Sequence, residues 1–246
     1  MRLKDRTALV TGGASGFGAG IARKFRDEGA RVMIADLNAE ACHAMADVLG
    51  AVCAIGDVGE DAGVAHIAAA ALAEFGHLDI LVNNAGITHM PTPMEDVPEE
   101  VFDNVLRVNA KSVYLTARHL VPHMRGRGAG AILNIASTAG LSPRPRLSWS
   151  NASKGWMITA TKAMAVELAP DGVRVNALCP VAGETPLLKS FLGEDTPEMR
   201  AKFLSTIPLG RFSTPQDLCN AAAFLCSEEA AMLTGVALEV DGGRCI

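Results

Sequence analysis

The sequence predicts an α/β protein with a doubly wound Rossmann fold, in which a mainly parallel, seven-stranded sheet carries helices on both faces. One observation is that short strand patterns alternate with helical patterns along the whole chain, as in parallel sheets joined by crossover helices. The other is a glycine-rich turn, Thr11 to Gly18, that follows the first strand directly and opens the first helix.

The expected strands are short apolar or β-branched runs bounded by turn residues. They lie at 7–10, 31–35, 52–55, 79–82, 131–136, 173–178 and 236–240. One helix is expected between the first two strands and a second one ending near 49. Further helical patterns lie at about 64–75, 98–125, 149–169, 198–206 and 216–227.

The chain has 246 residues and no Pro, Gly or Ser tract that would divide it, so we expect one domain over 1–246. The segment from about 183 to 215 is too long for a simple connection. In open parallel sheets, ligands bind beyond the carboxyl ends of the strands. We therefore expect this segment to form a substrate lid.

Composition favours a folded protein that acts on small molecules. The chain is 49% hydrophobic and 20% charged, with a net charge of −5. This hydrophobic fraction is sufficient for a sizeable core. Without a Lys/Arg run, no nucleic-acid partner is expected. There is no signal-type apolar region and no apolar run of membrane-spanning length, so a cytoplasmic protein without a membrane segment is expected.

No metal site or disulfide framework is indicated. The six cysteines show no C-x-x-C pairs, so we expect reduced and mostly buried thiols. His119 and His123 are four residues apart but lack a third ligand. We therefore interpret them as solvated or interface histidines.

The glycine turn has the spacing G-x-x-x-G-x-G. In a dinucleotide site, Gly12 allows the tight turn, Gly16 lets the backbone approach the pyrophosphate, and Gly18 permits close packing of helix on strand. The amino end of the following helix contributes N–H groups and a positive dipole. The turn is thus expected to bind a nicotinamide dinucleotide.

Asp36 ends the second expected strand, where a carboxylate can accept hydrogen bonds from the adenosine ribose hydroxyls. Its charge would repel a 2′-phosphate, and neither Ser15 nor Leu37 supplies a neutralising cation. NAD(H) is therefore predicted in preference to NADP(H). The alternative is that Asp36 merely caps the second helix.

Several further motifs follow in a fixed order. They are Asp57-Val58, Asn83-Asn84-Ala85-Gly86, Asn109 within Val108-Asn109-Ala110, Ser137, Ser153-Lys154, and the segment Pro180 to Thr185. With the glycine turn, this ordered set resembles the short-chain dehydrogenase/reductase family over nearly the whole chain. The resemblance implies a cofactor site made of Gly12, Ser15, Gly16, Phe17, Gly18, Asp36, Asp57, Val58, Asn84, Gly86, Lys154, Pro180, Val181 and Thr185.

Within that site, the resemblance assigns Asp57 and Val58 to the adenine and Thr185 to the nicotinamide carboxamide. Asn84 and Gly86 would line the channel. The family's usual Pro-Gly after the sixth strand is Pro180-Val181 here, so an extra side chain is present at that point.

Catalysis in the family uses a Tyr four residues before a Lys, a spacing that places both on one face of a helix. Lys154 is in register, but the residue four before it is Ser150, and the only tyrosine is Tyr114 on another expected helix. An aliphatic hydroxyl is far less acidic than a phenol. By resemblance, Ser137 would bind the substrate oxygen and Asn109 would hold a water of the proton relay.

The resulting prediction is an NAD-dependent oxidoreductase that interconverts a secondary alcohol and a ketone, strongly impaired by Ser150. Sugars or polyols and hydroxyacyl compounds are equally compatible substrates. Ser150 either was put in place of a tyrosine in an active enzyme or belongs to a natural non-catalytic NAD(H)-binding sensor or scaffold. An S-adenosylmethionine-dependent transferase would share the glycine turn and Asp36 but would not need Lys154 in register with Ser137.

The substrate pocket is expected after Ser137, beside the segment 89–90 and beneath the lid. Its apolar candidates are Met90, Leu147, Trp149, Leu187, Leu188 and Phe191, and its polar ones are His89, Ser142, Arg144, Arg146 and Glu184. The frequent use of arginine at interfaces favours a surface or intersubunit role for Arg144 and Arg146. The resemblance also implies a homotetramer, with contacts through the helices near 98–125 and 149–169 and through the C-terminal residues.

Overall fold

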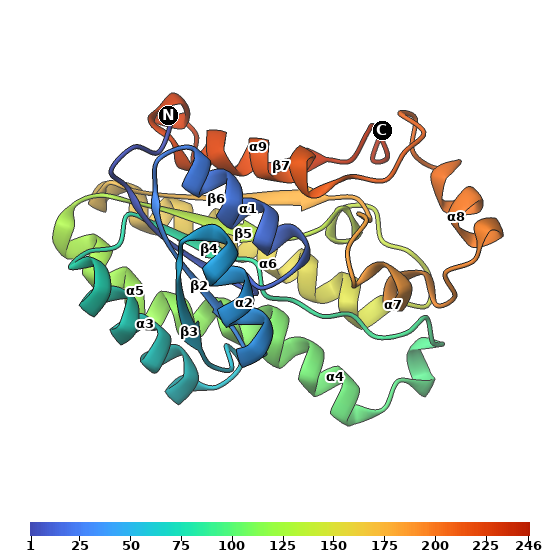
Figure 1. The fold of residues 1–246 in the computed structure, drawn as a ribbon. Coiled ribbons are helices and arrows are strands. Elements are labelled where there is room, and N and C mark those ends of the chain that lie inside the picture. The colour runs from blue at the N-terminus through green and yellow to red at the C-terminus, as the bar shows by residue number, and fades with distance from the viewer.

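The computed structural model describes all residues, 1–246, and has the predicted fold. Seven strands form one sheet in the order β3-β2-β1-β4-β5-β6-β7, and every neighbouring pair is parallel. Figure 1 shows helices stacked above and below this sheet. The strand order reverses between β1 and β4, which is where a doubly wound sheet binds its ligand.

The strands are β1 (Thr7–Thr11), β2 (Arg31–Asp36), β3 (Val52–Ile55), β4 (Ile80–Asn83), β5 (Gly130–Ile135), β6 (Val173–Pro180) and β7 (Ala237–Val240). The α-helices are α1 (Gly16–Asp27), α2 (Ala39–Leu49), α3 (Asp61–Phe75), α4 (Glu99–Leu106), α5 (Ser112–Arg127), α6 (Ser148–Leu168), α7 (Leu188–Leu192), α8 (Pro197–Leu204) and α9 (Pro215–Cys226). All seven predicted strands are present, with ends within about two residues of the expected ones.

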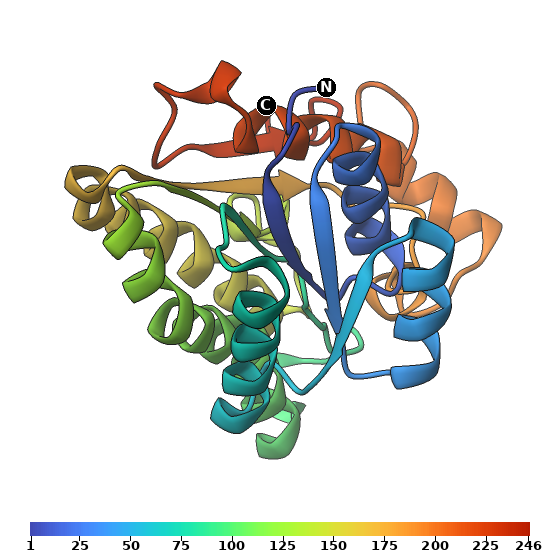
Figure 2. The same cartoon turned by 60° about the vertical axis from the view of Figure 1, so that its left-hand side comes forward.

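The two faces of the sheet carry separate hydrophobic cores, because successive strand residues point to opposite sides. In β1, Ala8 and Val10 pack with α1, α2 and α9, whereas Leu9 packs with α3, α5 and α6. Figure 2 shows these helix groups on opposite sides of the sheet. Burial on both faces explains why the strands are continuous apolar runs in the sequence.

The helix predicted at 98–125 is present as one uninterrupted helical segment over 99–127, but it contains a π-helical turn that was not predicted. The chain forms α4, then a π-helical turn at η2 (Arg107–Lys111), then α5. Asn109, in the middle of this turn, is fully buried. π-Helical turns inside helices are frequent at functional sites, and this one lies beside the cavity described below.

The segment expected to act as a lid contains two short helices, α7 and α8, and its ends meet at a bridge between Gly183 and Ser213. The sequence pattern did not reveal α7. Val181 has ordinary backbone geometry, and its side chain is buried in a cluster with Leu188 and Phe203 of the segment. The residue that replaces the family's glycine thus anchors this segment by packing.

Four of the six cysteines are buried, as expected, and the thiol of Cys53 donates to Cys42 Sγ at 2.7 Å. The two histidines on α5 have protein partners: His119 faces Asp61 at 3.0 Å, and the backbone N–H of Leu78 donates to His123 Nε2 at 3.3 Å. No helix in the chain combines the length and the apolar character needed to cross a membrane.

Candidate active site

A cavity of about 510 Å³ opens beyond the carboxyl ends of β1 and β4 and extends beneath α7. The predicted site residues that line it are Gly12, Ser15, Gly16, Phe17, Asp36, Asp57, Val58, Asn84, Gly86, Ser137, Ser150, Lys154, Pro180, Val181 and Thr185. Two other predicted site residues, Gly18 and Asn109, do not line the cavity but contact residues that do. The structure therefore brings into one place residues that are up to 173 positions apart, from 12 to 185.

The glycine turn leaves no room for side chains on its inner side. Gly12 and Gly16 have positive φ values, 61° and 53°, which L-residues with a Cβ rarely adopt. A Cβ on Gly18 would lie 2.1 Å from the carbonyl oxygen of Gly12, and Asn84 Nδ2 donates to that same oxygen at 3.0 Å. This narrow, N–H-bearing turn at the start of α1 fits the pyrophosphate of a dinucleotide.

Asp36 faces the glycine turn and does not cap α2. The backbone N–H of Ala14 donates to Asp36 Oδ2 at 3.1 Å. The residue that caps α2 is Asn38, whose side chain accepts from the backbone N–H of Ala41 at 3.0 Å. The alternative interpretation of Asp36 as the helix cap is therefore wrong, and its carboxylate lies on the cavity wall.

Asp57 is held by a cation that sequence reasoning missed. Arg107 Nη1 donates to Asp57 Oδ2 at 2.7 Å, and the backbone N–H of Gly59 donates to Oδ1 at 2.8 Å. Burial raises the pKa of Asp57, but these two hydrogen bonds outweigh it and keep that pKa below its usual value. Arg107 itself lines the cavity, so this end of the cavity carries a cation and a carboxylate side by side.

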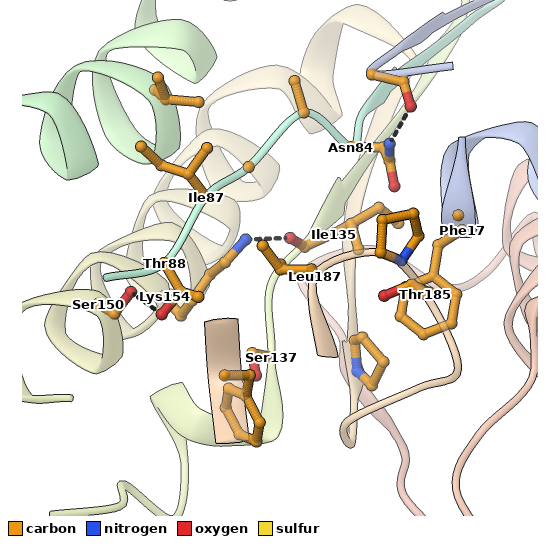
Figure 3. Close-up of a pocket in the computed structure, with 18 of the residues that line it drawn as sticks. Phe17, Asn84, Ile87, Thr88, Ile135, Ser137, Ser150, Lys154, Thr185 and Leu187 are labelled. Carbon is orange, nitrogen blue, oxygen red and sulfur yellow. Dashed lines mark hydrogen bonds between the residues drawn. The ribbon is translucent and has the colours of Figure 1, made fainter. Parts of the chain in front are cut away.

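Lys154, on α6, reaches across the cavity floor and donates from Nζ to the carbonyl oxygen of Ile135 at 2.8 Å (Figure 3). Surrounding protein atoms desolvate the ammonium, which lowers its pKa to about 8. No carboxylate forms an ion pair with this ammonium. The titratable group that acts on its charge is the buried thiol of Cys179. The group is thus a cation with one fixed acceptor at the centre of the site.

Ser150 lies one helical turn before Lys154 but uses a different partner. Its Oγ donates to Thr88 Oγ1 at 2.8 Å (Figure 3). Thr88 donates in turn to the carbonyl oxygen of His89 at 3.3 Å. The side chain is buried, and its proton is donated to Thr88. At this position, where the resemblance expects a tyrosine, there is therefore no acidic group.

Ser137 lies directly after β5, where it both caps a turn and lines the cavity. Its side chain accepts from the backbone N–H of Ala139 at 3.0 Å and so caps the 3-10 turn η3 (Thr138–Gly140). The same residue lines the cavity. As a hydroxyl, it still has its own proton to donate to a ligand oxygen.

Asn109 supports the site through hydrogen bonds on both of its amide atoms. Its Oδ1 accepts from the backbone N–H of Ile87 at 2.8 Å, and its Nδ2 donates to the Ile87 carbonyl and to Ser153 Oγ, both at 2.9 Å. A Cβ on Gly86 would lie 3.3 Å from both Asn109 Oδ1 and Lys154 Nζ. Gly86 thus keeps the space open between these two side chains.

Some expected pocket residues lie elsewhere. Leu147, Leu187, Leu188 and Phe191 line the cavity, whereas Trp149 and Met90 do not. Trp149 donates from Nε1 to the carbonyl oxygen of Met94 and packs edge-on against Phe102 with ring centres 5.4 Å apart. None of the five polar pocket candidates lines the cavity.

Fold and site together define a Rossmann-type oxidoreductase. A family model described as enoyl-(acyl carrier protein) reductase matches residues 12–244. The chain belongs to the short-chain dehydrogenase/reductase family.

Relatives cover the full length of the chain. A 4-formylbenzenesulfonate dehydrogenase of Comamonas testosteroni is 51% identical, with 100% of each chain covered. A 2-(R)-hydroxypropyl-CoM dehydrogenase of Xanthobacter autotrophicus is 40% identical, with 97% of this chain and 98% of the relative covered. The solved structure of a 3-ketoacyl-(acyl-carrier-protein) reductase from Brucella melitensis, complexed with NADH, is 49% identical, with a TM-score of 0.95 and coverage of 99% and 100%.

Proposed function

We propose that this protein is an NAD(H)-dependent oxidoreductase that interconverts a secondary alcohol and a carbonyl compound, present here in a strongly impaired form. The observation that carries the proposal is that the glycine turn, Asp36, Ser137 and Lys154 line one cavity. Two relatives support the substrate class, since one is a 2-(R)-hydroxypropyl-CoM dehydrogenase and the other a 3-ketoacyl-(acyl-carrier-protein) reductase.

The cofactor would lie along the cavity with its pyrophosphate on the glycine turn and its adenosine ribose on Asp36. Thr185 closes over the turn, because a Cβ on Gly16 would lie only 3.3 Å from the Thr185 Cβ. Lys154 would hold the nicotinamide ribose. When bound, the nicotinamide ring supplies the hydride acceptor or donor.

The choice of NAD(H) over NADP(H) is supported by the charge at the ribose end. The Asp36 carboxylate forms no ion pair with a cation, and the next residue, Leu37, which also lines the cavity, is apolar. Arg107, the nearest cation on the adenine side, is already bound to Asp57. Calorimetric titration tests this choice, because tighter binding of NADP⁺ than of NAD⁺ would refute it.

Impairment follows from the missing proton donor. Ser137 can donate a hydrogen bond to a substrate oxygen, but nothing in the cavity takes the place of a phenol next to Lys154. Positioned proton transfer is typically worth about 10²- to 10⁴-fold in rate. Ser150→Tyr is therefore expected to raise alcohol-dependent NADH formation by about that factor.

Ser150→Phe is the matched control, since it adds the same ring without the hydroxyl. Activity in the tyrosine variant alone supports proton transfer. If both variants bind NAD⁺ but remain inactive on a broad panel of alcohols, the result supports the alternative proposal of an NAD(H)-binding sensor or scaffold. The family assignment argues against an S-adenosylmethionine-dependent transferase.

We further propose a cytoplasmic homotetramer with contacts through α5 and α6. Large apolar side chains are exposed on these two helices: Tyr114, Trp156 and Val166 are 53%, 43% and 79% exposed. Such residues are typical of buried interface cores. A monomeric mass by light scattering would refute the assembly.

A further inference from the structure

The loop before α6 holds a guanidinium between two aromatic rings of the lid. The Arg144 guanidinium carbon lies 4.7 Å from the ring centre of Phe191 on α7 and 4.6 Å from that of Phe203 on α8. Phe191 lines the cavity, and Phe203 stands edge-on to it with ring centres 5.7 Å apart. Arg144 is thus separated from the cavity by a single aromatic side chain.

This guanidinium has no anionic partner. Its Nη1 is buried without any hydrogen-bond acceptor, and Arg144 takes part in none of the ion pairs of the chain. Arg200 on the same lid differs, since its Nη2 donates to Asp195 at 2.9 Å. Burial lowers the pKa of Arg144, and the neighbouring cation Arg244 lowers it further. The site is therefore a partly buried positive charge that the protein leaves uncompensated.

A second unpartnered polar atom lies on the adjoining loop. His89 Nδ1 lies 2.8 Å from the carbonyl oxygen of Met90, so it must carry the proton, and the buried Nε2 has no partner. The backbone N–H of Thr92 donates to the carbonyl oxygen of Arg146 at 2.8 Å, which joins this loop to the one carrying Arg144. These are the only two buried side-chain polar atoms without a partner in the chain.

Unpartnered buried polar groups are rare in native proteins because each one costs free energy. Here two such atoms lie on hydrogen-bonded loops next to one cavity. A ligand that forms hydrogen bonds with them would remove this cost. A guanidinium binds carboxylates and sulfonates well, since its planar N–H groups match two oxygens at once. The aromatic faces meanwhile hold the cation in place by cation–π contact.

Building on the proposed oxidoreductase function, we propose that Arg144 binds an anionic group, a carboxylate or sulfonate, on the far end of the substrate. Phe191 must move aside for this contact. It belongs to a helix of only five residues, which the buried Leu188 and Leu192 attach to the lid cluster. The earlier interpretation of Arg144 as a surface or intersubunit residue is replaced by this role.

Two probes of the same shape test the charge preference without requiring turnover. Benzenesulfonate and benzenesulfonamide differ in charge, and their binding is measured by calorimetry with the wild-type chain, with and without saturating NADH. We expect the sulfonate to bind at least about 10-fold more tightly, as one charge-assisted hydrogen-bond pair provides. Equal binding of the two probes would overturn the proposal.

Variants then assign the preference to one residue. Arg144→Met keeps the length of the side chain and its packing on the two rings, and it is expected to weaken sulfonate binding by about 10- to 100-fold. Sulfonamide binding should not change. Arg144→Lys should lose only part of the preference, and Arg23→Gln, which removes an exposed arginine of α1, should lose none. If Arg144→Met weakens both probes equally, the residue acts only in packing and the proposal fails.

A further outcome separates this proposal from the proposed function. If Ser150→Tyr remains inactive while the sulfonate preference depends on Arg144, the anion site stands and the oxidoreductase proposal fails.

Discussion

The buried ammonium of Lys154 predicts a specific dependence of stability on pH. Replacing it in Lys154→Met removes a group whose pKa falls from 10.5 to about 8 in the folded chain. Below pH 8 the lysine is charged in both states, and the folded state bears the cost of desolvating it. Between pH 8 and 10.5 the unfolded chain binds more protons than the folded one, so the wild type gains stability as pH rises.

The shift sets the size of this effect. A change of 2.5 pKa units corresponds to about 3 kcal/mol at 1.36 kcal/mol per unit, and water in the cavity makes this an upper limit. The Cys179 thiol next to the ammonium does not interfere below pH 11, because burial raises its pKa to about 12. The stability of the wild type minus that of Lys154→Met should therefore rise by up to about 3 kcal/mol between pH 7.5 and 10.5.

Urea denaturation at several pH values measures this difference. Lys162→Met is the control, since Lys162 lies on the same helix with its ammonium in water. Its difference from the wild type should stay constant over the same range. A Lys154→Met difference that stays flat or falls with pH would refute the view that the ammonium is desolvated.

Four further variants test the site and its scaffold. Gly18→Ala forces a Cβ to within 2.1 Å of the Gly12 carbonyl oxygen, so we expect a loss of about 3 kcal/mol in unfolding free energy and no NAD⁺ binding by calorimetry. Gly126→Ala, on an open helical surface, should instead stabilise by about 0.5–1 kcal/mol. Asp36→Ser should weaken NAD⁺ binding by about 10-fold and improve NADP⁺ binding; an unchanged ratio would argue against its ribose role. Thr214→Ala, which removes the side-chain cap of α9, should cost about 1 kcal/mol in urea denaturation.

The sequence predicted those parts of the fold that depend on local pattern. Strands buried on both faces leave continuous apolar runs, and the glycine turn has a distinctive spacing of glycines. Both were therefore predicted close to their observed positions. The helix predicted at 98–125 is present, but its π-helical turn was missed because that turn depends on a tertiary contact. Asn109 binds both backbone groups of Ile87, 22 residues earlier, and no helical period reports such a contact.

The same limit applies to the site. Ordered motifs identified the residues on the cavity wall, but their partners were not predicted. Arg107 on Asp57 and Thr88 on Ser150 are pairs between residues 50 and 62 positions apart. The position of Trp149 was also missed, because an aromatic ring beside a predicted site can pack against a neighbouring helix such as α4 equally well.

The free-energy cost of burying the Lys154 ammonium helps to interpret the serine at position 150. A desolvated ammonium with a single hydrogen bond to Ile135 lowers stability at neutral pH, so packing gives no reason to keep it. Gly86 likewise keeps open a space beside that ammonium which a methyl group would narrow. A chain with no use for a polar ligand at this point would gain stability from a methionine in place of the lysine. This supports the proposal that the cavity holds a ligand that binds a cation there. Under the proposed function, the serine would change the proton transfer available to that ligand and not the place where it binds.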